Sequence, residues 1–405
     1  MRLLYFHQYF STPMGTVGSR SYEMARRLVA RGHQVVMVCA SAVRGTTGIA
    51  TPFVNGRRRG IVDGIDVIEF DLSYSNRDGF LRRTAVFLRF AVLSVVVALR
   101  EPCDLVFATT TPLTAGIPGI VARWLRGRPF VFEVRDLWPE LPRAMGVIRN
   151  PVVLWAMSVL EWVSYRSADR LVGLAPGIVD GIARRGVART RIALIPNGCD
   201  LGLFAAADPW RPEGVAPSDL MAVFAGAHGI ANGLDAVLDA AGELQARGCV
   251  DVKIVLIGEG MRKEHLRSRA ERERLRNVIF HDPVPKRKLA GLMSSTDVGL
   301  QILDNVPAFY EGTSPNKFFD YLAAGLPVLI NYPGWLARIV QESACGYAVA
   351  PAERKAFADA LIHAALHRSE LESMGQRASA LARERFDRSR LADEFADWVA
   401  GPGAP

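Results

Sequence analysis

Residues that could bind a sugar phosphate gather around one helix predicted in the C-terminal half of the chain. Ser314 can cap a helix whose first residue is Pro315, because proline there lacks only an N–H that would have no partner. Lys317 follows in the first turn, where free N–H groups and the helix dipole favour an anion. Asp320, one turn later, can accept hydrogen bonds from sugar hydroxyls. An ordinary capped helix with a solvated lysine and aspartate fits the same residues.

The end of this helix is also indicated. Gly325 is placed for the left-handed position that closes a helix, and Pro327 with residues 328–330 opens a buried strand. The predicted buried face of the helix consists of Phe318, Phe319, Tyr321 and Leu322.

A second loop that could approach a phosphate follows the first predicted strand. Gly15 and Gly18 would let a diphosphate come close to backbone N–H groups, and Arg20 opens the following helix. The spacing matches neither the dinucleotide-binding fingerprint nor the P-loop, so neither a dehydrogenase nor a P-loop nucleotidase is supported. A plain strand-to-helix connection remains the alternative.

The composition predicts a globular protein of two or three domains. The chain has 405 residues, of which 50% are hydrophobic and 22% charged. Five scattered cysteines without a CxxC pair argue against disulfides and zinc, and with no signal-peptide pattern they favour the cytoplasm. The net charge of +8 attracts anions, but no basic stripe with interleaved aromatic residues indicates nucleic acid.

Short apolar runs alternate with helical patterns along the whole chain, which predicts an α/β fold with two parallel sheets. A helix is expected at 19–31, and two more over 370–399 before a disordered tail. The expected strands are 3–6, 34–39, 65–70, 105–108, 130–134 and 171–174, then, after a restart near residue 192, 221–224, 252–257, 278–280, 298–303 and 328–330.

Several stretches, taken together, resemble a known enzyme family. Arg31-Gly32-His33-Gln34-Val35, Ile195-Pro196-Asn197-Gly198-Cys199-Asp200, Ile257-Gly258-Glu259-Gly260 and Ala323-Ala324-Gly325-Leu326-Pro327 occur in the order found in GT-B-fold glycosyltransferases of family 4. The run Phe132 to Glu140 and the run Ser314 to Lys317 are similar to the bacterial branch that builds O-antigen, capsule and exopolysaccharide, including N-acetylfucosaminyl transferases.

The resemblance implies a retaining hexosyltransferase with two Rossmann-like domains that face a central cleft. Residues 1–185 would bind the acceptor, 186–378 would bind the nucleotide-sugar donor, a helix at 379–400 would return to the first domain, and 401–405 would be a disordered tail. The donor would be UDP-linked and the acceptor a polyprenyl-linked or other saccharide. Neither a metal nor a cofactor is expected.

Two departures from the family concern the donor site. The first of two family glutamates falls on Gly312, with Glu311 one place away, and the second becomes Asp320. The basic pair that neutralises the diphosphate is missing from residues 226–233, so Lys317 is the nearest replacement. The expected donor-binding residues are Gly15, Gly18, Arg20, Gly226, His228, Asn232, Gly258, Glu259, Glu311, Ser314, Asn316, Lys317 and Asp320.

The acceptor side is expected at the end of the strand 130–134. Asp136 and Glu140 follow it and could act as base or orienting group, although a departing phosphate can take the proton itself. With Lys317 these are the proposed catalytic residues, while His7, Arg135 and Trp138 would contact the acceptor. A turn shaped by Trp138-Pro139 with solvated carboxylates, and a core histidine at position 7, are the alternatives.

The stretch 82–100 is apolar but is split by Arg89, so it falls short of the about 20 apolar residues a membrane span needs. Its first half, with Arg82 and Arg83, would instead lie on anionic lipid at the inner face of the cell membrane. Residues 92–99 would pack on the sheet, and the apolar side of the first half would consist of Phe80, Leu81, Phe87 and Phe90. A UDP-sugar epimerase of similar fold and a nonenzymatic nucleotide-binding protein are the competing functions.

Overall fold

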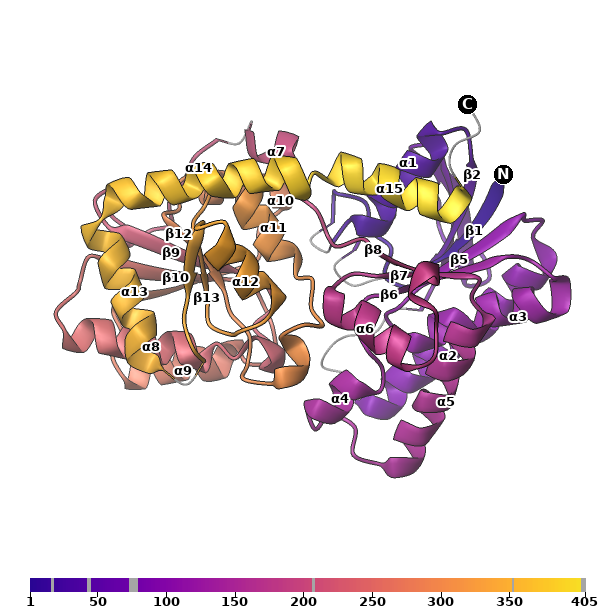
Figure 1. The fold of residues 1–405 in the computed structure, drawn as a ribbon, viewed down its shortest axis with the longest axis horizontal. Helices are drawn as coiled ribbons and strands as arrows, with labels where there is room; N and C mark the ends of the chain where they lie inside the picture. The colour runs from indigo at the N-terminus through magenta and orange to yellow at the C-terminus, as the bar shows by residue number, and fades with distance from the viewer. Residues whose placement is uncertain (16–17, 42–44, 73–78, 206–207, 352, 402–405) are drawn as a thin grey trace. The chain divides into compact units, whose positions relative to one another are not determined.

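A computed structural model describes residues 1–401 of the protein, with the exception of 16–17, 42–44, 73–78, 206–207 and 352. Two compact units divide the chain. The first unit comprises Met1–Pro196, Gly312–Ser314 and Ser389–Pro405, and the second comprises Asn197–Glu311 and Pro315–Arg388. Each unit contains one sheet with helices on both faces, which confirms the predicted α/β class with two Rossmann-like domains (Figure 1). Most of the expected tail falls on residues outside the described part.

The sheet of the first unit has the strand order β3-β4-β2-β1-β5-β6-β7-β8, with every pair parallel except β3 with β4. Its strands are β1 (Arg2–Phe6), β2 (Gln34–Ala40), β3 (Arg57–Val62), β4 (Ile65–Phe70), β5 (Leu105–Thr109), β6 (Phe130–Val134), β7 (Arg170–Gly173) and β8 (Ile192–Leu194). Its helices are α1 (Arg20–Ala30), α2 (Phe80–Arg100), α3 (Ile117–Arg126), α4 (Glu140–Ala144), α5 (Pro151–Ser167), α6 (Pro176–Arg184) and α15 (Arg388–Ala400).

The sheet of the second unit is all parallel, in the order β11-β10-β9-β12-β13-β14. Its strands are β9 (Leu220–Ala225), β10 (Val252–Ile257), β11 (Val278–His281), β12 (Val298–Gln301), β13 (Val328–Ile330) and β14 (Gly346–Ala348). Its helices are α7 (Leu201–Ala205), α8 (Asp235–Ala246), α9 (Lys263–Arg272), α10 (Lys286–Met293), α11 (Asn316–Ala323), α12 (Trp335–Glu342), α13 (Arg354–Leu366) and α14 (Arg368–Arg385).

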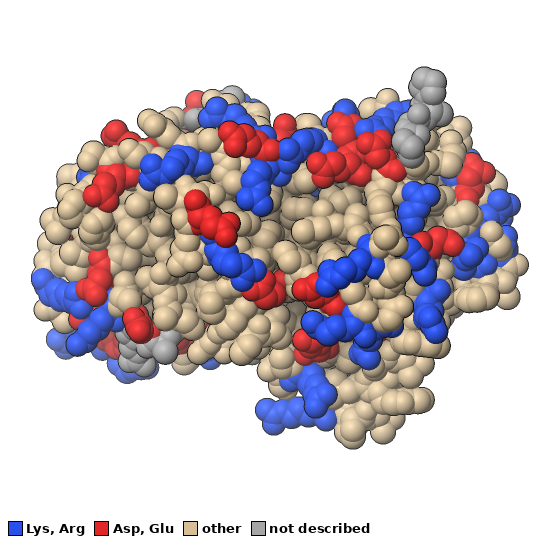
Figure 2. Space-filling model, in the orientation of Figure 1, with Lys and Arg blue, Asp and Glu red and all other residues tan. Residues whose placement is uncertain are grey.

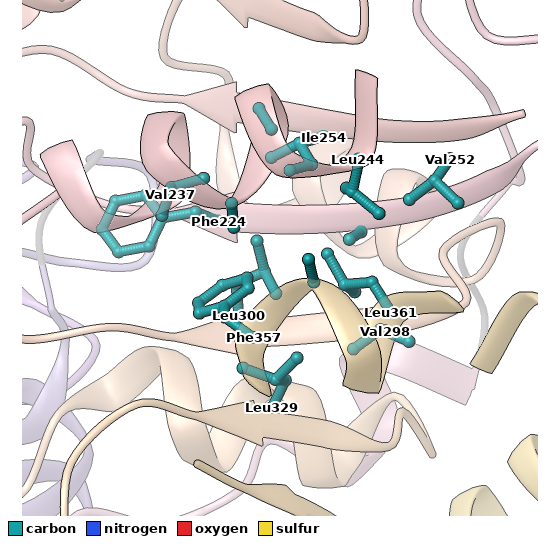
Figure 3. Packing of buried hydrophobic residues seen from close by; sticks show 14 of the residues in the cluster. Phe224, Val237, Leu244, Val252, Ile254, Val298, Leu300, Leu329, Phe357 and Leu361 are labelled. Atoms are coloured by element: carbon teal, nitrogen blue, oxygen red, sulfur yellow. The ribbon is translucent and has the colours of Figure 1, made fainter. Parts of the chain in front are cut away.

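A dense apolar core fixes the central strands of the second unit. Side chains of β9, β10 and β12 interdigitate with those of α8 and α13, and Phe224, Leu300 and Phe357 come together in it (Figure 3). Because such interiors are close-packed, the carboxyl ends of these strands are held in fixed positions. Any site built on those ends is therefore carried by a rigid support.

One domain boundary and one strand differ from the expectations. Residues 186–196, which were expected to open the second domain, lie in the first unit because β8 pairs with β7, with Leu171 opposite Ile192. Strand β3 was not foreseen; it forms a hairpin with β4 through Asp63-Gly64, whose φ values are +48° and +82°. The Asp-Gly pair is the signal that could have revealed this hairpin.

The C-terminal helix α15 belongs to the first unit, as the predicted return of the chain requires. Asp393 pairs with Arg27 and Arg31 of α1, and Figure 1 shows the two helices side by side. The ring of Phe395 lies 5.1 Å from that of Phe107 on β5. Helix α14 stays with the second unit, so the chain rejoins the first unit at Ser389 and not at the expected residue 379.

Helix α2 differs in part from the interpretation of residues 80–100. Phe90, expected to face lipid, is fully buried, and Val92, expected in the core, is 64% exposed. The exposed apolar stripe runs the full length of the helix through Leu81, Leu88, Val92, Val96 and Leu99, because these positions recur at helical spacing. The side chain of Phe80 lies outside the described part. Among the described residues, no helix is both long and apolar enough to cross a membrane.

Candidate functional site

The order of strands in the second unit creates one position suited to a ligand. The chain builds β10 and β11 on one side of β9 and then returns to place β12 on the other side. In open parallel sheets, ligands bind outside the carboxyl ends of the strands where the order reverses in this way. The loop 226–233 follows β9 at this point, and Lys317 of α11 lies against it.

Lys317 is the cation at this position. Its Nζ donates to Oδ1 of Asn232 at 2.8 Å and lies 4.0 Å from the centroid of the Phe224 ring. Burial lowers the pKa of Lys317 to about 7. Within the described part of the chain no carboxylate lies at ion-pair distance from this ammonium, so its charge is not neutralised by the protein. Lys317 is half-buried, and a partly desolvated cation without a counter-charge is stabilised when an anion binds.

Glycines allow the surrounding loops to approach one another closely. A Cβ at Gly258 would lie 1.8 Å from the carbonyl oxygen of Gly226, and one at Gly260 would lie 2.4 Å from that of His228. A Cβ at Gly226 would lie 3.2 Å from Cε of Lys317. The predicted glycines Gly226 and Gly258 therefore pack the β9 and β10 loops together and leave room for the lysine.

His228 is fully buried, and neither ring nitrogen has a hydrogen-bond partner among the residues that the structure describes. Burial, with the neighbouring charge of Lys263, lowers its pKa to about 4, so the ring is neutral at pH 7. A neutral imidazole has one N–H donor and one acceptor, and both are unused here. Its ring centroid lies 6.2 Å from that of Phe224, beside the site of Lys317.

Asp320 is buried, 6% exposed, and faces basic side chains rather than solvent. Its Oδ1 lies 3.4 Å from Nζ of Lys286, which also pairs with Asp200. Burial raises the pKa of Asp320, an effect that Lys286 and Arg388 partly offset. The sequence analysis did not identify Lys286 and Arg388 as residues of this site. Asp200, which pairs with both, ends the Ile195 to Asp200 motif and was the residue that could have pointed to them.

The start of α11 differs from the prediction. The helix begins at Asn316, which is exposed, and Pro315 occupies the N-cap position without a side-chain cap bond, so Ser314 is not the cap. Its end is as predicted: Gly325 has φ +68°, and Leu326 N–H donates to Tyr321 O at 3.0 Å. Because proline has no side-chain hydrogen-bond acceptor, Pro315 cannot cap the N–H groups of the first turn.

Two predicted acidic residues form ion pairs inside the second unit. Glu311 binds Arg338 through both carboxylate oxygens, at 2.6 and 2.7 Å. Glu259 lies 3.4 Å from Nζ of Lys263, which also pairs with Asp282 at 2.5 Å. Both carboxylates are thus already neutralised before any ligand is considered.

The first unit has its own cluster where the strand order reverses between β1 and β5. Arg20 is 3% exposed and pairs with the fully buried Glu133 at 2.9 Å, while its other N–H groups donate to the carbonyls of Ile195 and Pro196. Burial opposes ionisation of Glu133, but Arg20 and Arg135 hold its pKa below the usual value. Arg20 therefore holds the end of the first unit together, and its expected contact with the donor stays a prediction.

Nε2 of His7 lies 3.2 Å from Nη1 of Arg135, so two of the expected acceptor residues meet. Burial and the charge of Arg135 keep the pKa of His7 well below its ordinary value. Asp136 accepts from Thr111 at 3.1 Å, and burial raises its pKa. Thus the carboxyl ends of β1, β5 and β6 converge on one polar cluster.

The remaining predicted residues lie apart from these contacts. Glu140 is exposed at the start of α4, 4.0 Å from Arg184. The indole N–H of Trp138 is buried without a partner. A Cβ at Gly15 would lie 2.3 Å from Ser11 Oγ and 3.2 Å from the backbone N of Thr46, so Gly15 is closely packed; Gly18 is exposed.

None of the predicted site residues belongs to a metal-ligand cluster in the described part of the chain. The cluster found there is His363, His367 and Glu370, all exposed at the junction of α13 and α14. The absence of a metal at the donor site stays a prediction. On the face drawn in Figure 2, basic and acidic side chains are interspersed.

Comparison with known proteins gives two family matches and many structural neighbours. A glycosyl transferase 4-like domain matches residues 15–198, and a glycosyl transferases group 1 domain matches residues 220–366. WcaI of Escherichia coli (strain K12), provisionally named a colanic acid biosynthesis glycosyl transferase, is 21% identical over 338 residues, or 80% of this chain and 82% of WcaI.

Three solved structures illustrate the likeness in fold. Sucrose-phosphate synthase from Thermosynechococcus elongatus has a TM-score of 0.74 at 15% identity, covering 98% of this chain and 97% of its own. WaaG, a glycosyltransferase involved in lipopolysaccharide biosynthesis, has a TM-score of 0.70 at 15% identity, covering 99% and 100%. Anabaena Alr3699/HepE in complex with UDP-glucose has the same values. All three support the GT-B arrangement that the sequence motifs implied.

Proposed function

Because this chain is a glycosyltransferase of the GT-B fold, we propose that it transfers a sugar from a UDP-linked donor to a lipid-linked saccharide with retention of configuration. The sugar would be an N-acetylated hexose or deoxyhexose, as in the N-acetylfucosaminyl transferases that the Ser314 to Lys317 run resembles. The neighbours solved with UDP-glucose, and those named for lipopolysaccharide and colanic acid synthesis, support this class of substrate.

The observation that carries the proposal is the half-buried ammonium of Lys317 at the reversal of strand order, where no described carboxylate lies at ion-pair distance from it. The diphosphate of the donor would supply the missing negative charge, with the first-turn N–H groups of α11 beside it. As the glycosidic bond breaks, charge grows on the leaving diphosphate, so a donor aimed at it lowers the barrier. His228, with an unused N–H, would add a second, neutral donor.

The other donor contacts follow from the same loops. Asp320 would accept hydrogen bonds from ribose hydroxyls, with Lys286 holding its carboxylate. Gly226, Gly258, Glu259, Asn232 and Asn316 would line the diphosphate and sugar. Because the carboxylates of Glu311 and Glu259 are ion-paired, their contacts with a sugar would be secondary.

The acceptor would meet the first unit. Asp136, whose pKa is raised by burial, and Glu140 are the carboxylates that could take or direct the proton of its hydroxyl. His7, Arg135 and Trp138 would position it. The departing diphosphate can also remove this proton, so loss of either carboxylate alone need not abolish turnover.

Association with the inner face of the cytoplasmic membrane is part of the proposal. The exposed apolar stripe of α2, with Leu81, Leu88 and Val92, lies on the same helix as Arg82 and Arg89. Each arginine near an anionic surface adds about 1 kcal/mol of attraction. Replacing Arg82, Arg83 and Arg89 by Ser should release the protein from anionic vesicles; unchanged co-sedimentation, or none in the parent, would reject this part.

The donor assignment is tested by thermal shift with UDP, GDP and TDP. Only UDP at about 100 times its Kd should stabilise the protein, by about 2.7 kcal/mol. Release of UDP from UDP-sugars should then require a lipid-linked saccharide acceptor. Release without any acceptor would instead indicate an epimerase, and no stabilisation by any nucleotide would contradict a nucleotide-sugar enzyme.

A further inference from the structure

A pocket of about 880 Å³ lies in the first unit between α4 and the first half of α5. It is lined by Glu140, Arg143, Arg149, Leu154, Trp155 and Arg185, among others. Three arginines, one carboxylate and one tryptophan in a single hollow are a set of groups suited to a ligand with both charged and flat parts.

Two of the arginines are available for an anion. In the part of the chain that the structure describes, neither Arg143 nor Arg149 has a carboxylate at ion-pair distance; Arg149 donates only its Nε, to Gly146 O at 3.2 Å. Arg185 is held in place by Glu161 at 2.6 Å and by Ser158 at 3.0 Å. Figure 2 shows basic side chains gathered where α4 lies in Figure 1. Guanidinium groups bind phosphate oxygens through two parallel hydrogen bonds.

The opposite rim of the pocket is apolar. Trp155 is 68% exposed and Val152, one turn earlier on α5, is 69% exposed. Val159 and Trp162 continue this row at helical spacing. Exposed rows of this kind mark contacts with lipid or another apolar partner, and tryptophan favours the membrane interface.

We propose that this pocket binds the acceptor through its diphosphate, at the point where a lipid chain is joined to the saccharide. Arg143 and Arg149 would bind the diphosphate, and the Val152–Trp155 row would receive the start of the apolar chain. Glu140 would repel a bare anion, but it can accept a hydrogen bond from a hydroxyl of the attached sugar. The ligand must therefore carry both a diphosphate and a sugar. The inference rests on the proposed lipid-linked acceptor and names the residues that recognise it.

Binding of farnesyl diphosphate, inorganic diphosphate and farnesol to the full chain, measured by isothermal titration with UDP saturating the proposed donor site at Lys317, tests the proposal. Farnesyl diphosphate should bind more tightly than either fragment. The double variant Arg143→Ser/Arg149→Ser should lose about tenfold or more in this affinity, as expected for hydrogen bonds to a charged group. Trp155→Ala should weaken farnesyl diphosphate binding but leave that of inorganic diphosphate unchanged.

Arg57→Ser removes one guanidinium charge from an exposed position on β3 and should leave the affinity unchanged. Stabilisation by UDP, measured on each variant, shows that the fold and the donor site remain intact. Equal affinity of the parent and the double variant would overturn the proposal, as would inorganic diphosphate binding as tightly as farnesyl diphosphate. If the parent protein does not bind UDP, that result would contradict the proposed donor and not the proposed role of this pocket.

Discussion

The ammonium of Lys317 lies 2.8 Å from Oδ1 of Asn232. Asn232 is the last residue of a short helical turn in the loop that follows β9. Asn232 in turn donates to Ala227 O at 2.8 Å, so the contact fixes the loop as well as the lysine. An amide oxygen orients the ammonium without neutralising it. The lysine is therefore held in place with its charge still available to a diphosphate.

Lys317→Ala should lower kcat by about two orders of magnitude, some 2.7 kcal/mol, because it removes an interaction that strengthens as the phosphate leaves. The fold should survive, since no carboxylate of the described residues lies at ion-pair distance from this lysine. Steady-state kinetics beside circular dichroism measures both effects. Full turnover in a folded variant would move the diphosphate site elsewhere.

Asp320→Asn provides the contrast at the same helix. It weakens a contact present in both ground and transition states, so the donor KM should rise while kcat changes little. A fall in kcat as large as that of Lys317→Ala would mean that Asp320 acts in the transition state instead.

Gly258→Ala should destabilise the second unit by about 1–3 kcal/mol, since overpacking forces the backbone to shift. The added methyl group would lie 1.8 Å from the carbonyl oxygen of Gly226. Urea unfolding gives the change in free energy, and UDP affinity should fall with it because the loop carrying Gly226 moves. The control Gly202→Ala, with nothing within 4 Å, should be neutral or slightly stabilising; a Gly258→Ala protein as stable as this control would refute the packing argument.

Arg20→Ala should cost about 3–5 kcal/mol of unfolding free energy, because Glu133 would be left buried without its main partner. The exposed pair Arg189–Asp180 has the same chemistry, with side chains 67% and 48% exposed. Arg189→Ala should therefore cost under about 1 kcal/mol. Similar losses of unfolding free energy in the two variants would show that burial does not make the Arg20–Glu133 pair more important for stability than an exposed pair.

Periodicity predicted both parallel sheets, and the end of α11 at Gly325 was indicated by local chemistry. Contacts between segments that are distant in the sequence could not be predicted. Strand β8 has the same apolar character in either unit, and only its pairing with β7 assigns it to the first. The ion pair of Arg20 with Glu133 could not be predicted, because the two residues are 113 positions apart and no local pattern connects them.

The donor site shows the same limit. Lys317, Asn232 and His228 could each be selected from the sequence, but the lack of a counter-charge for Lys317 appears only when the loops are packed together. Lys286 was missed because no local pattern places a lysine of α10 beside Asp320. Exposure of Val92 and burial of Phe90 on α2 depended on which face of that helix meets the sheet.

Proton uptake on binding of UDP-N-acetylglucosamine at pH 8 tests the central claim most directly. With a pKa of about 7, about nine-tenths of Lys317 is neutral at that pH in the free protein, and an adjacent diphosphate raises its pKa. Isothermal titration in two buffers of different ionisation enthalpy should therefore show uptake of close to one proton by the parent. Lys317→Arg, always charged, should show almost none. Binding without proton uptake by the parent, or equal uptake by Lys317→Arg, would contradict the placement of the donor diphosphate at Lys317.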